Sequence, residues 1–398
     1  MIEMNVHYAE LKESYLFAGI AKKTAEYLER HPGSRLLRLG IGDVSLPLAP
    51  AVIEALHEAV DDQSRKESFQ GYLPECGAPF LREAIARHYA ESGVEVAPKE
   101  IFRSSGASDE LGDILDLFSP RSAALVVEPA YPAYVDANVM AGRRVERLEA
   151  GKDDGFAPWP DPEAKADLIY LCSPSNPTGS VYSRKKLQAW VDYANERGAV
   201  ILFDAAYEAF IEDPGTPHSI FEIDGARTCA IEICSLSKTA GFTGTRLGYT
   251  IIPKELRREG LSLDGMWTRN RTTKTNGVSY IIQKGAAAVF TPEGRRQIEG
   301  NIKVYKGNAR VITGALSELG IWYCGGENAP YVWMECPNGM LSWEFFDYLL
   351  EEIQVVGTPG EGFGVCGEGF FRLSSFGDPD DTIEAMERLK GLLRGACA

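Results

Sequence analysis

The sequence has few of the features that accompany nucleic-acid binding, metal binding or membrane insertion. Its 41 Lys and Arg against 57 Asp and Glu give a formal net charge of −16, which argues against bulk binding to nucleic acid or an anionic membrane. The five histidines are far apart, with no i, i+4 pair, so no metal site is expected. No apolar run approaches the roughly 20 residues that cross a bilayer. The start, MIEMNVHYAELKESYLF, lacks the basic and apolar regions of a signal peptide.

Cysteine pairs are also missing. The eight cysteines are scattered and form no C-x-x-C motif, and several lie in apolar segments such as LIYLCS and CAIEICS. This distribution is typical of reduced core residues in a cytoplasmic protein.

What is present is enough apolar sequence for a large core. The chain has 398 residues, 44% of them hydrophobic, which favours two domains. Short β-branched runs alternate with amphipathic patterns, which predicts an α/β fold with a mostly parallel central sheet. One such pattern predicts a helix over 183–198. The predicted strands are 123–128, 167–173, 199–204, 229–235 and 246–252.

The pattern changes after residue 290. Helices are expected at 292–319, 342–353 and 380–394, with short strands between them, which predicts a smaller α+β domain. We expect a large domain over 46–290 and a small domain formed by 1–45 and 291–398.

The segment CSLSKTAGFTGTRLGY (234–249) places one lysine among small residues. Ser235 and Lys238 match the Ser-x-x-Lys dyad of acyl-serine enzymes. Alternatively, Lys238 is itself a nucleophile that forms a Schiff base with a carbonyl cofactor, or an ordinary surface lysine in a turn. The acyl-serine enzymes also need S-D-N and K-T-G elements, and the chain contains neither.

A second glycine-rich segment, GEGFGVCGEG, contains the G-x-G-x-x-G pattern of dinucleotide-binding proteins. That pattern should end a strand and begin a helix. Here the strand-like FFRLSS follows directly, so NAD binding is not expected.

Polar residues follow several predicted strands. Asp204 ends AVILFD, Asn176 follows DLIYLC, and Tyr131 follows AALVVE; open α/β sheets bind ligands at this edge. Pyridoxal phosphate needs a carboxylate for its ring nitrogen, an aromatic plane and an anion site, and Arg246 could reach its phosphate. Taken singly, Asp204 could be a helix cap and Asn176 a turn residue.

SPSNPTG, FDAAYEAF and SLSK…TRLG, in this order and spacing, resemble fold-type I pyridoxal-phosphate aminotransferases from end to end. Longer blocks look like the LL-diaminopimelate aminotransferase subfamily: SYLFAGIAKKTAEY, LGIGDVSLPLAPAVIEALH, GYLPECG, EPAYPAYVDANVMAG, TKTNGVSYIIQKGAAAVF and GGENAPYVWMECP.

The resemblance implies a role for each matching residue. Lys238 would be the Schiff-base lysine and proton shuttle, and Asp204 would pair with the ring nitrogen. Tyr207 and Asn176 would hold the phenolate oxygen, Tyr131 would stack on the ring, and Arg372 would bind the substrate α-carboxylate. Implied around the phosphate are Ala107, Ser108, Ser235, Ser237 and Arg246; implied in the substrate pocket are Tyr15 and Gly42; and implied from the partner of a homodimer are Tyr72, Glu75 and Asn276.

The chain departs from the family at one position beside the phosphate. The family usually has G-A-K there, and its lysine also reaches the far end of the substrate; this chain has GASDE, with Ser108 in that place. If the substrate is diaminopimelate, another cation, for which Lys274 is a candidate, must bind its distal carboxylate. The alternatives left open are transfer to a different amino acid, β-elimination, acyl hydrolysis and ligand binding without a cofactor.

Overall fold

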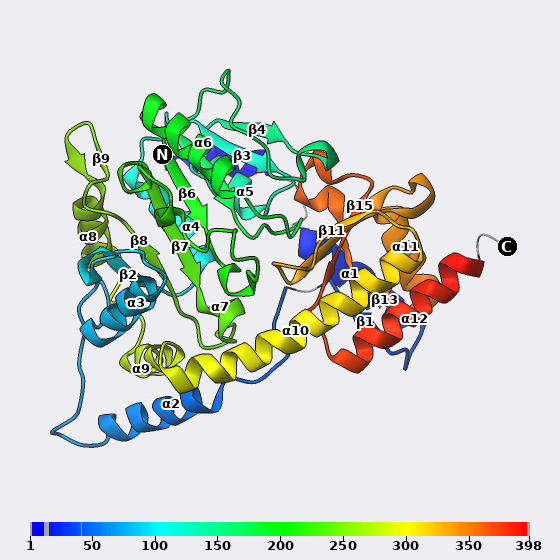
Figure 1. Cartoon of the computed structure of the whole chain (residues 1–398), viewed down its shortest axis with the longest axis horizontal. Helices are drawn as coiled ribbons and strands as arrows, with labels where there is room; N and C mark the ends of the chain where they lie inside the picture. The colour runs from blue at the N-terminus through cyan, green and yellow to red at the C-terminus, as the bar shows by residue number, and fades with distance from the viewer. Residues whose placement is uncertain (1, 12–15, 41, 396–398) are drawn as a thin grey trace.

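The computed structural model describes residues 2–11, 16–40 and 42–395. Figure 1 shows a large sheet with its helices beside a smaller sheet built from the C-terminal part of the chain, with α10 (Pro292–Glu318) running along both. In the described part of the chain, no helix has the length and apolar character needed to cross a membrane.

The large sheet has seven strands in the order β2-β8-β7-β6-β5-β3-β4. All of its neighbouring pairs are parallel except those made by β8, which is antiparallel to β7 and β2. The predicted mostly parallel sheet is therefore confirmed. Its strands are β2 Ile101–Ser104, β3 Ala124–Glu128, β4 Val145–Glu149, β5 Leu168–Cys172, β6 Val200–Asp204, β7 Ala230–Ser235 and β8 Gly248–Ile251.

Both faces of this sheet are buried. Alternate residues of one strand point to opposite sides of the sheet, and in β6 the residues of both sides pack in hydrophobic clusters. Ile201 and Phe203 of β6 belong to one hydrophobic cluster, whereas Val200 and Leu202 belong to another. The predicted helix at 183–198 is α6, which ends at Gly198 in the left-handed region (φ 70°). The other helices of this part are α2 Pro50–Gln63, α3 Pro79–Glu91, α4 Ala107–Asp113, α5 Ala133–Met140, α6 Arg184–Arg197, α7 Leu236–Thr239, α8 Leu263–Lys274 and α9 Tyr280–Val289. A short hairpin joins β9 Arg257–Arg258 and β10 Leu261–Ser262.

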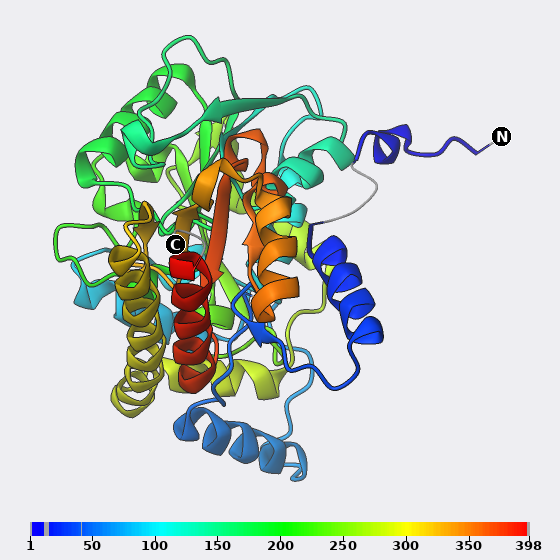
Figure 2. The same cartoon turned by 90° about the vertical axis from the view of Figure 1, so that its right-hand side faces the viewer.

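The smaller sheet is antiparallel, with the order β11-β12-β15-β14. Figure 2 shows α10 and α12 side by side, with α1 beside α11. A separate two-stranded parallel sheet pairs β1 with β13. The elements are α1 Leu16–Arg30, β1 Leu37–Arg38, β11 Tyr323–Gly325, β12 Tyr331–Glu335, α11 Ser342–Ile353, β13 Val355–Val356, β14 Thr358–Pro359, β15 Phe370–Ser374 and α12 Pro379–Gly395.

The hydrophobic clusters favour the proposed division of the chain, whose boundaries remain a prediction. Leu16 and Leu37 share a core with Trp333 of the smaller sheet, as expected if 1–45 and 291–398 form one domain. Helix α10 takes part in both cores: Ile302 packs in the large cluster and Ile312 in the small one. The predicted boundary at residue 290 therefore lies just before α10, a helix that packs in the cores of both parts.

Candidate active site

A pocket of about 400 Å³ opens at the edge of the large sheet where strands β3, β5, β6 and β7 end. Parallel strands bring residues that are far apart in the sequence to this edge. Twelve of the predicted site residues line the pocket: Gly42, Ala107, Ser108, Tyr131, Asn176, Asp204, Tyr207, Ser235, Ser237, Lys238, Arg246 and Arg372.

Lys238 lies on the short helix α7, which β7 leads into directly. Its Nζ donates to the Gly42 carbonyl, while Ser235 Oγ accepts the Ser237 amide at 3.1 Å. The two members of the supposed acyl-serine dyad therefore bind other groups. The pKa of Lys238 is lowered to about 8: burial is the main cause, Asp43 opposes the shift, and the nearby cations Arg372 and Arg246 add to it.

This lowered pKa should be visible in the reactivity of the lysine. In protein stripped of any cofactor, we expect reductive methylation of Lys238 to rise with a midpoint near pH 8, because only the neutral amine reacts. The exposed Lys303 on α10 is the internal reference. Quantitative mass spectrometry of the two peptides across pH measures both methylation profiles; a Lys238 profile that coincides with that of the reference would contradict a perturbed Lys238.

Asp204 is a buried carboxylate, 6% exposed, at the end of β6. Tyr134 donates to its Oδ2 at 2.6 Å and the Ala206 amide to its Oδ1 at 3.0 Å. Burial raises its pKa, and the two hydrogen bonds oppose the shift. Among the described residues no Lys or Arg forms an ion pair with it. A protonated ring nitrogen would supply the positive charge that this carboxylate otherwise lacks.

Tyr134 was not predicted, although it lies only three residues after Tyr131, in the first turn of α5. We expect Tyr134→Phe to reduce kcat by about tenfold or more, since a hydrogen bond to a charged group contributes roughly 1.5–3 kcal/mol. Losing this bond raises the pKa of Asp204 further, so the acid limb of the pH–rate profile should move to higher pH.

Tyr170→Phe is the matched control for this prediction. Its ring stacks on Tyr134 at 5.1 Å, but its hydroxyl accepts from Asn138 rather than contacting Asp204. Equal effects of the two substitutions on the pH profile would assign Tyr134 a packing role only.

The other end of the pocket carries donors suited to an anion. Arg246 has a positive φ of 61°, and its Nη1 donates to Ser237 Oγ at 3.2 Å. Its other terminal nitrogen lies where a Cβ on Gly106 would be, so only glycine leaves this approach open. The amides of Ala107 and Ser108 begin α4 and have no acceptor within the helix. A guanidinium, free amides and hydroxyls form a phosphate-binding donor set.

Arg372 closes the pocket from the smaller sheet. It is 1% exposed on β15, an interior strand, and donates to Asn176 Oδ1 at 2.6 Å and to the Gly40 carbonyl at 2.7 Å. It also stacks over Tyr331 at 4.4 Å. Burial lowers its pKa, and its Nε has no partner among the described residues. A fixed, incompletely satisfied guanidinium is a suitable site for a carboxylate.

Tyr207 of the large part and Tyr331 of the smaller part are in contact and line the pocket together with Asn176. Their hydroxyls are 2.9 Å apart, and Tyr331 was not predicted, because nothing in GGENAPYVWMEC distinguishes it from a core tyrosine. Also missed were Phe17, Asp43 and Thr243, which line the pocket. On the other side, the Ser108 hydroxyl lies 3.4 Å from that of Tyr131.

Four predicted residues do not line this pocket in the described chain. Tyr72 is 89% exposed, Asn276 is exposed and Glu75 is half-buried; the resemblance assigns these three to a partner subunit. Tyr15 lies outside the described residues.

The residues present fit pyridoxal 5′-phosphate. The pocket combines a weakly basic lysine, a buried carboxylate without a cation, a phosphate-binding donor set and a buried guanidinium. Together with the sheet order, they define a pyridoxal-phosphate-dependent aminotransferase of fold type I. The family model described as "Aminotransferase class I and II" matches residues 34–389, and the chain belongs to this family.

Individual relatives are more specific. The chain is 49% identical to the LL-diaminopimelate aminotransferase of Agathobacter rectalis, covering 98% of this chain and 100% of that protein. For the enzyme of the same name from Parabacteroides distasonis the values are 47%, 99% and 100%. Among solved structures, the L,L-diaminopimelate aminotransferase from Chlamydomonas reinhardtii superposes with a TM-score of 0.93 at 37% identity, covering 98% of each chain.

Proposed function

We propose that this chain is an LL-diaminopimelate:2-oxoglutarate aminotransferase, which works as a cytoplasmic homodimer and forms LL-diaminopimelate from tetrahydrodipicolinate and glutamate for lysine synthesis. One observation carries the proposal: Lys238 lines the same pocket as Asp204, Arg246 and Arg372, in a chain that matches relatives of that name over nearly its whole length. The exposed Tyr72, together with Glu75 and Asn276, would complete the site of the partner subunit.

The bound cofactor supplies an electron sink for the charge left on the substrate Cα when its proton departs. Lys238 accepts that proton and later returns one, and its pKa of about 8 suits both steps near neutral pH. Asp204 keeps the ring nitrogen protonated. Arg372 fixes the substrate α-carboxylate and so orients the Cα–H bond towards Lys238.

The substrate is tested by assaying purified holoenzyme with 2-oxoglutarate and a panel of amino donors, measuring glutamate formed. LL-diaminopimelate should give the highest kcat/KM, with aspartate, alanine, phenylalanine and lysine much poorer. Efficient use of another donor, with little glutamate from LL-diaminopimelate, would show a different aminotransferase specificity. Pyruvate or ammonia released from a β-substituted amino acid would instead indicate β-elimination.

Ser108→Lys tests the departure from the family pattern. If other groups already bind the distal end of the substrate, restoring the lysine should change kcat/KM for LL-diaminopimelate by less than about threefold. If instead the enzyme prefers another amino acid, LL-diaminopimelate should be a poor donor. One new charged hydrogen bond from Ser108→Lys should then improve kcat/KM for LL-diaminopimelate by roughly tenfold or more. The suggested replacement, Lys274, is exposed on α8, pairs with Asp116 and does not line the pocket of its own chain.

A further inference from the structure

A second cavity, of about 300 Å³, lies behind α7. Leu236 and Thr239 of this helix line it, whereas Ser237 and Lys238 line the catalytic pocket. Of the described lining residues, Ser235 alone is common to the two. A molecule in the second cavity would therefore contact the rear of the helix that carries the catalytic lysine.

Three aromatic rings form part of the cavity wall. The rings of Tyr89 and Tyr249 are 6.4 Å apart at 80°, and those of Tyr249 and Phe290 are 6.4 Å apart at 66°. Aromatic faces carry negative potential and attract organic cations.

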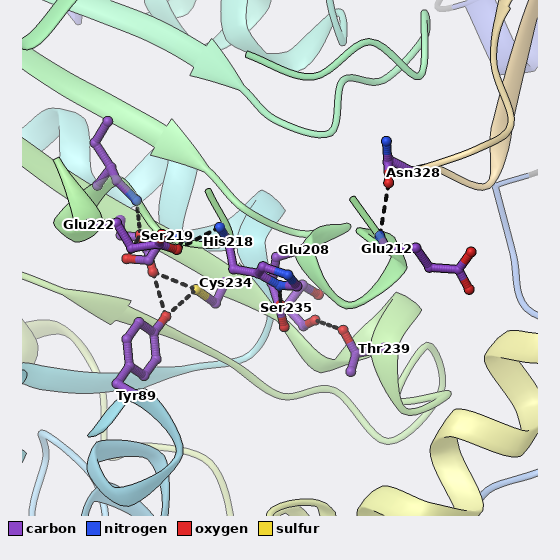
Figure 3. Close-up of polar contacts among 12 residues, drawn as sticks. Tyr89, Glu208, Glu212, His218, Ser219, Glu222, Cys234, Ser235, Thr239 and Asn328 are labelled. Carbon is purple, nitrogen blue, oxygen red and sulfur yellow. Dashed lines mark hydrogen bonds and ion pairs between the residues drawn. The ribbon is translucent and has the colours of Figure 1, made fainter. Parts of the chain in front are cut away.

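The charged lining is mainly acidic. Glu208, Glu222 and Glu299 line the cavity, and Arg295, which pairs with Glu91, is the one Lys or Arg among the described lining residues. Glu222 forms an ion pair with Arg184, and the hydrogen bond to Glu208 raises the pKa of His218. Glu208 also faces His218, whose Nδ1 is 3.2 Å from Glu208 Oε2. Figure 3 shows Ser219 and Glu222 on the side of Cys234 that faces Tyr89, and Glu208 and the His218 ring beside Ser235.

The negative charge of Glu208 affects the pKa values of three buried residues beside the cavity, which we call its floor: Glu232, Cys234 and Tyr249. Burial is the main cause of the raised pKa values of Glu232, Cys234 and Tyr249, but the charge of Glu208 raises all three as well. Glu232 is held in place by Ser219 Oγ at 2.6 Å and the Ile220 amide at 2.9 Å. The floor is thus a fixed polar network rather than a loosely packed gap.

The cavity lies away from the residues assigned to the dimer contact. His88 and Tyr89 are near the C-terminal end of α3, while Glu75 precedes its N-terminal end; Val289 ends α9, while Asn276 precedes its start. Each helix separates the two features by about 15–20 Å, at 1.5 Å per residue.

We propose that this cavity is a second binding site, specific for a small organic ammonium ion that the aromatic rings and Glu208 hold against the rear of α7. This site serves no step of amino transfer. Its cation selectivity distinguishes it from the catalytic pocket, where Lys238, Arg246 and Arg372 favour anions.

Calorimetric titration of the holoenzyme with choline tests the proposal. Choline has no primary amine that could react with the cofactor, and 3,3-dimethylbutan-1-ol is its neutral counterpart, with carbon in place of nitrogen. We expect choline to bind at least about tenfold more tightly than the alcohol. Equal affinities, or no binding of either, would overturn the proposal.

Variants locate the site. Glu208→Gln keeps a hydrogen-bonding group towards His218 but removes the charge, and should weaken choline binding about fivefold or more; Phe290→Leu should weaken it similarly. Glu212→Gln is the matched control, because Glu212 follows on the same segment but pairs with Lys306 outside the cavity. Choline affinity unchanged in both test variants, or reduced equally by Glu212→Gln, would place the cation elsewhere and overturn the assignment.

Discussion

Lys238→Ala is expected to reduce amino transfer by about 10,000-fold or more, the largest effect of any single substitution in this chain. The substitution removes the amine that moves the Cα proton, and positioned proton transfer alone contributes roughly 100- to 10,000-fold. Arg246, Ser237 and the amides of α4 remain, so the variant should still retain pyridoxal phosphate through its phosphate. Steady-state rates and the phosphate content of the dialysed protein measure the two effects separately.

Lys303→Ala provides the matched control, because it removes a lysine from an exposed position on α10. It should leave kcat within about twofold of the parent enzyme. A Lys238→Ala enzyme within tenfold of the parent would mean that another group moves the proton.

Asp204→Asn should slow the reaction of bound cofactor with amino donor by about 1,000-fold while the protein stays folded. Asparagine keeps one acceptor oxygen for the Ala206 amide, and its NH2 group can donate to the Tyr134 hydroxyl oxygen in place of the bond that Asp204 accepts. It carries no charge to keep the ring nitrogen protonated. Stopped-flow absorbance of a single half-reaction measures the rate without interference from product release.

The control for this variant is Asp167→Asn. Asp167 also binds a backbone amide through its carboxylate, that of Ala123 at 2.8 Å, but it lies at the start of β5, away from the pocket. Similar small effects of both substitutions would show that Asp204 merely caps the turn after β6.

The sequence predicts best where one strong pattern controls the structure. Strands β5, β6 and β7 are near-continuous apolar runs because both faces of the sheet are covered, and each is observed within about a residue of its predicted range. Strand β4, VERLE, escaped prediction because it lies at the edge of the sheet and is largely uncovered, so it carries charged residues. Strand β2 was not predicted either, because it is only four residues long and includes a charged residue, the buried Arg103.

The candidate site follows the same logic. Asp204, Asn176 and Tyr131 were predicted because each follows a recognisable strand, and parallel strands must end at one edge. Tyr331 and Phe17 come from the smaller part of the chain, and their approach depends on how two cores pack together. No local pattern encodes that packing.

The central claim, that Lys238 is the residue that holds the cofactor, has one direct test. Holoenzyme is reduced with borohydride, digested, and its peptides mapped by mass spectrometry. The account predicts one modified peptide, with the reduced pyridoxyl phosphate attached to Lys238. The modification on any other lysine, or a reduced protein without covalently attached cofactor, would contradict it.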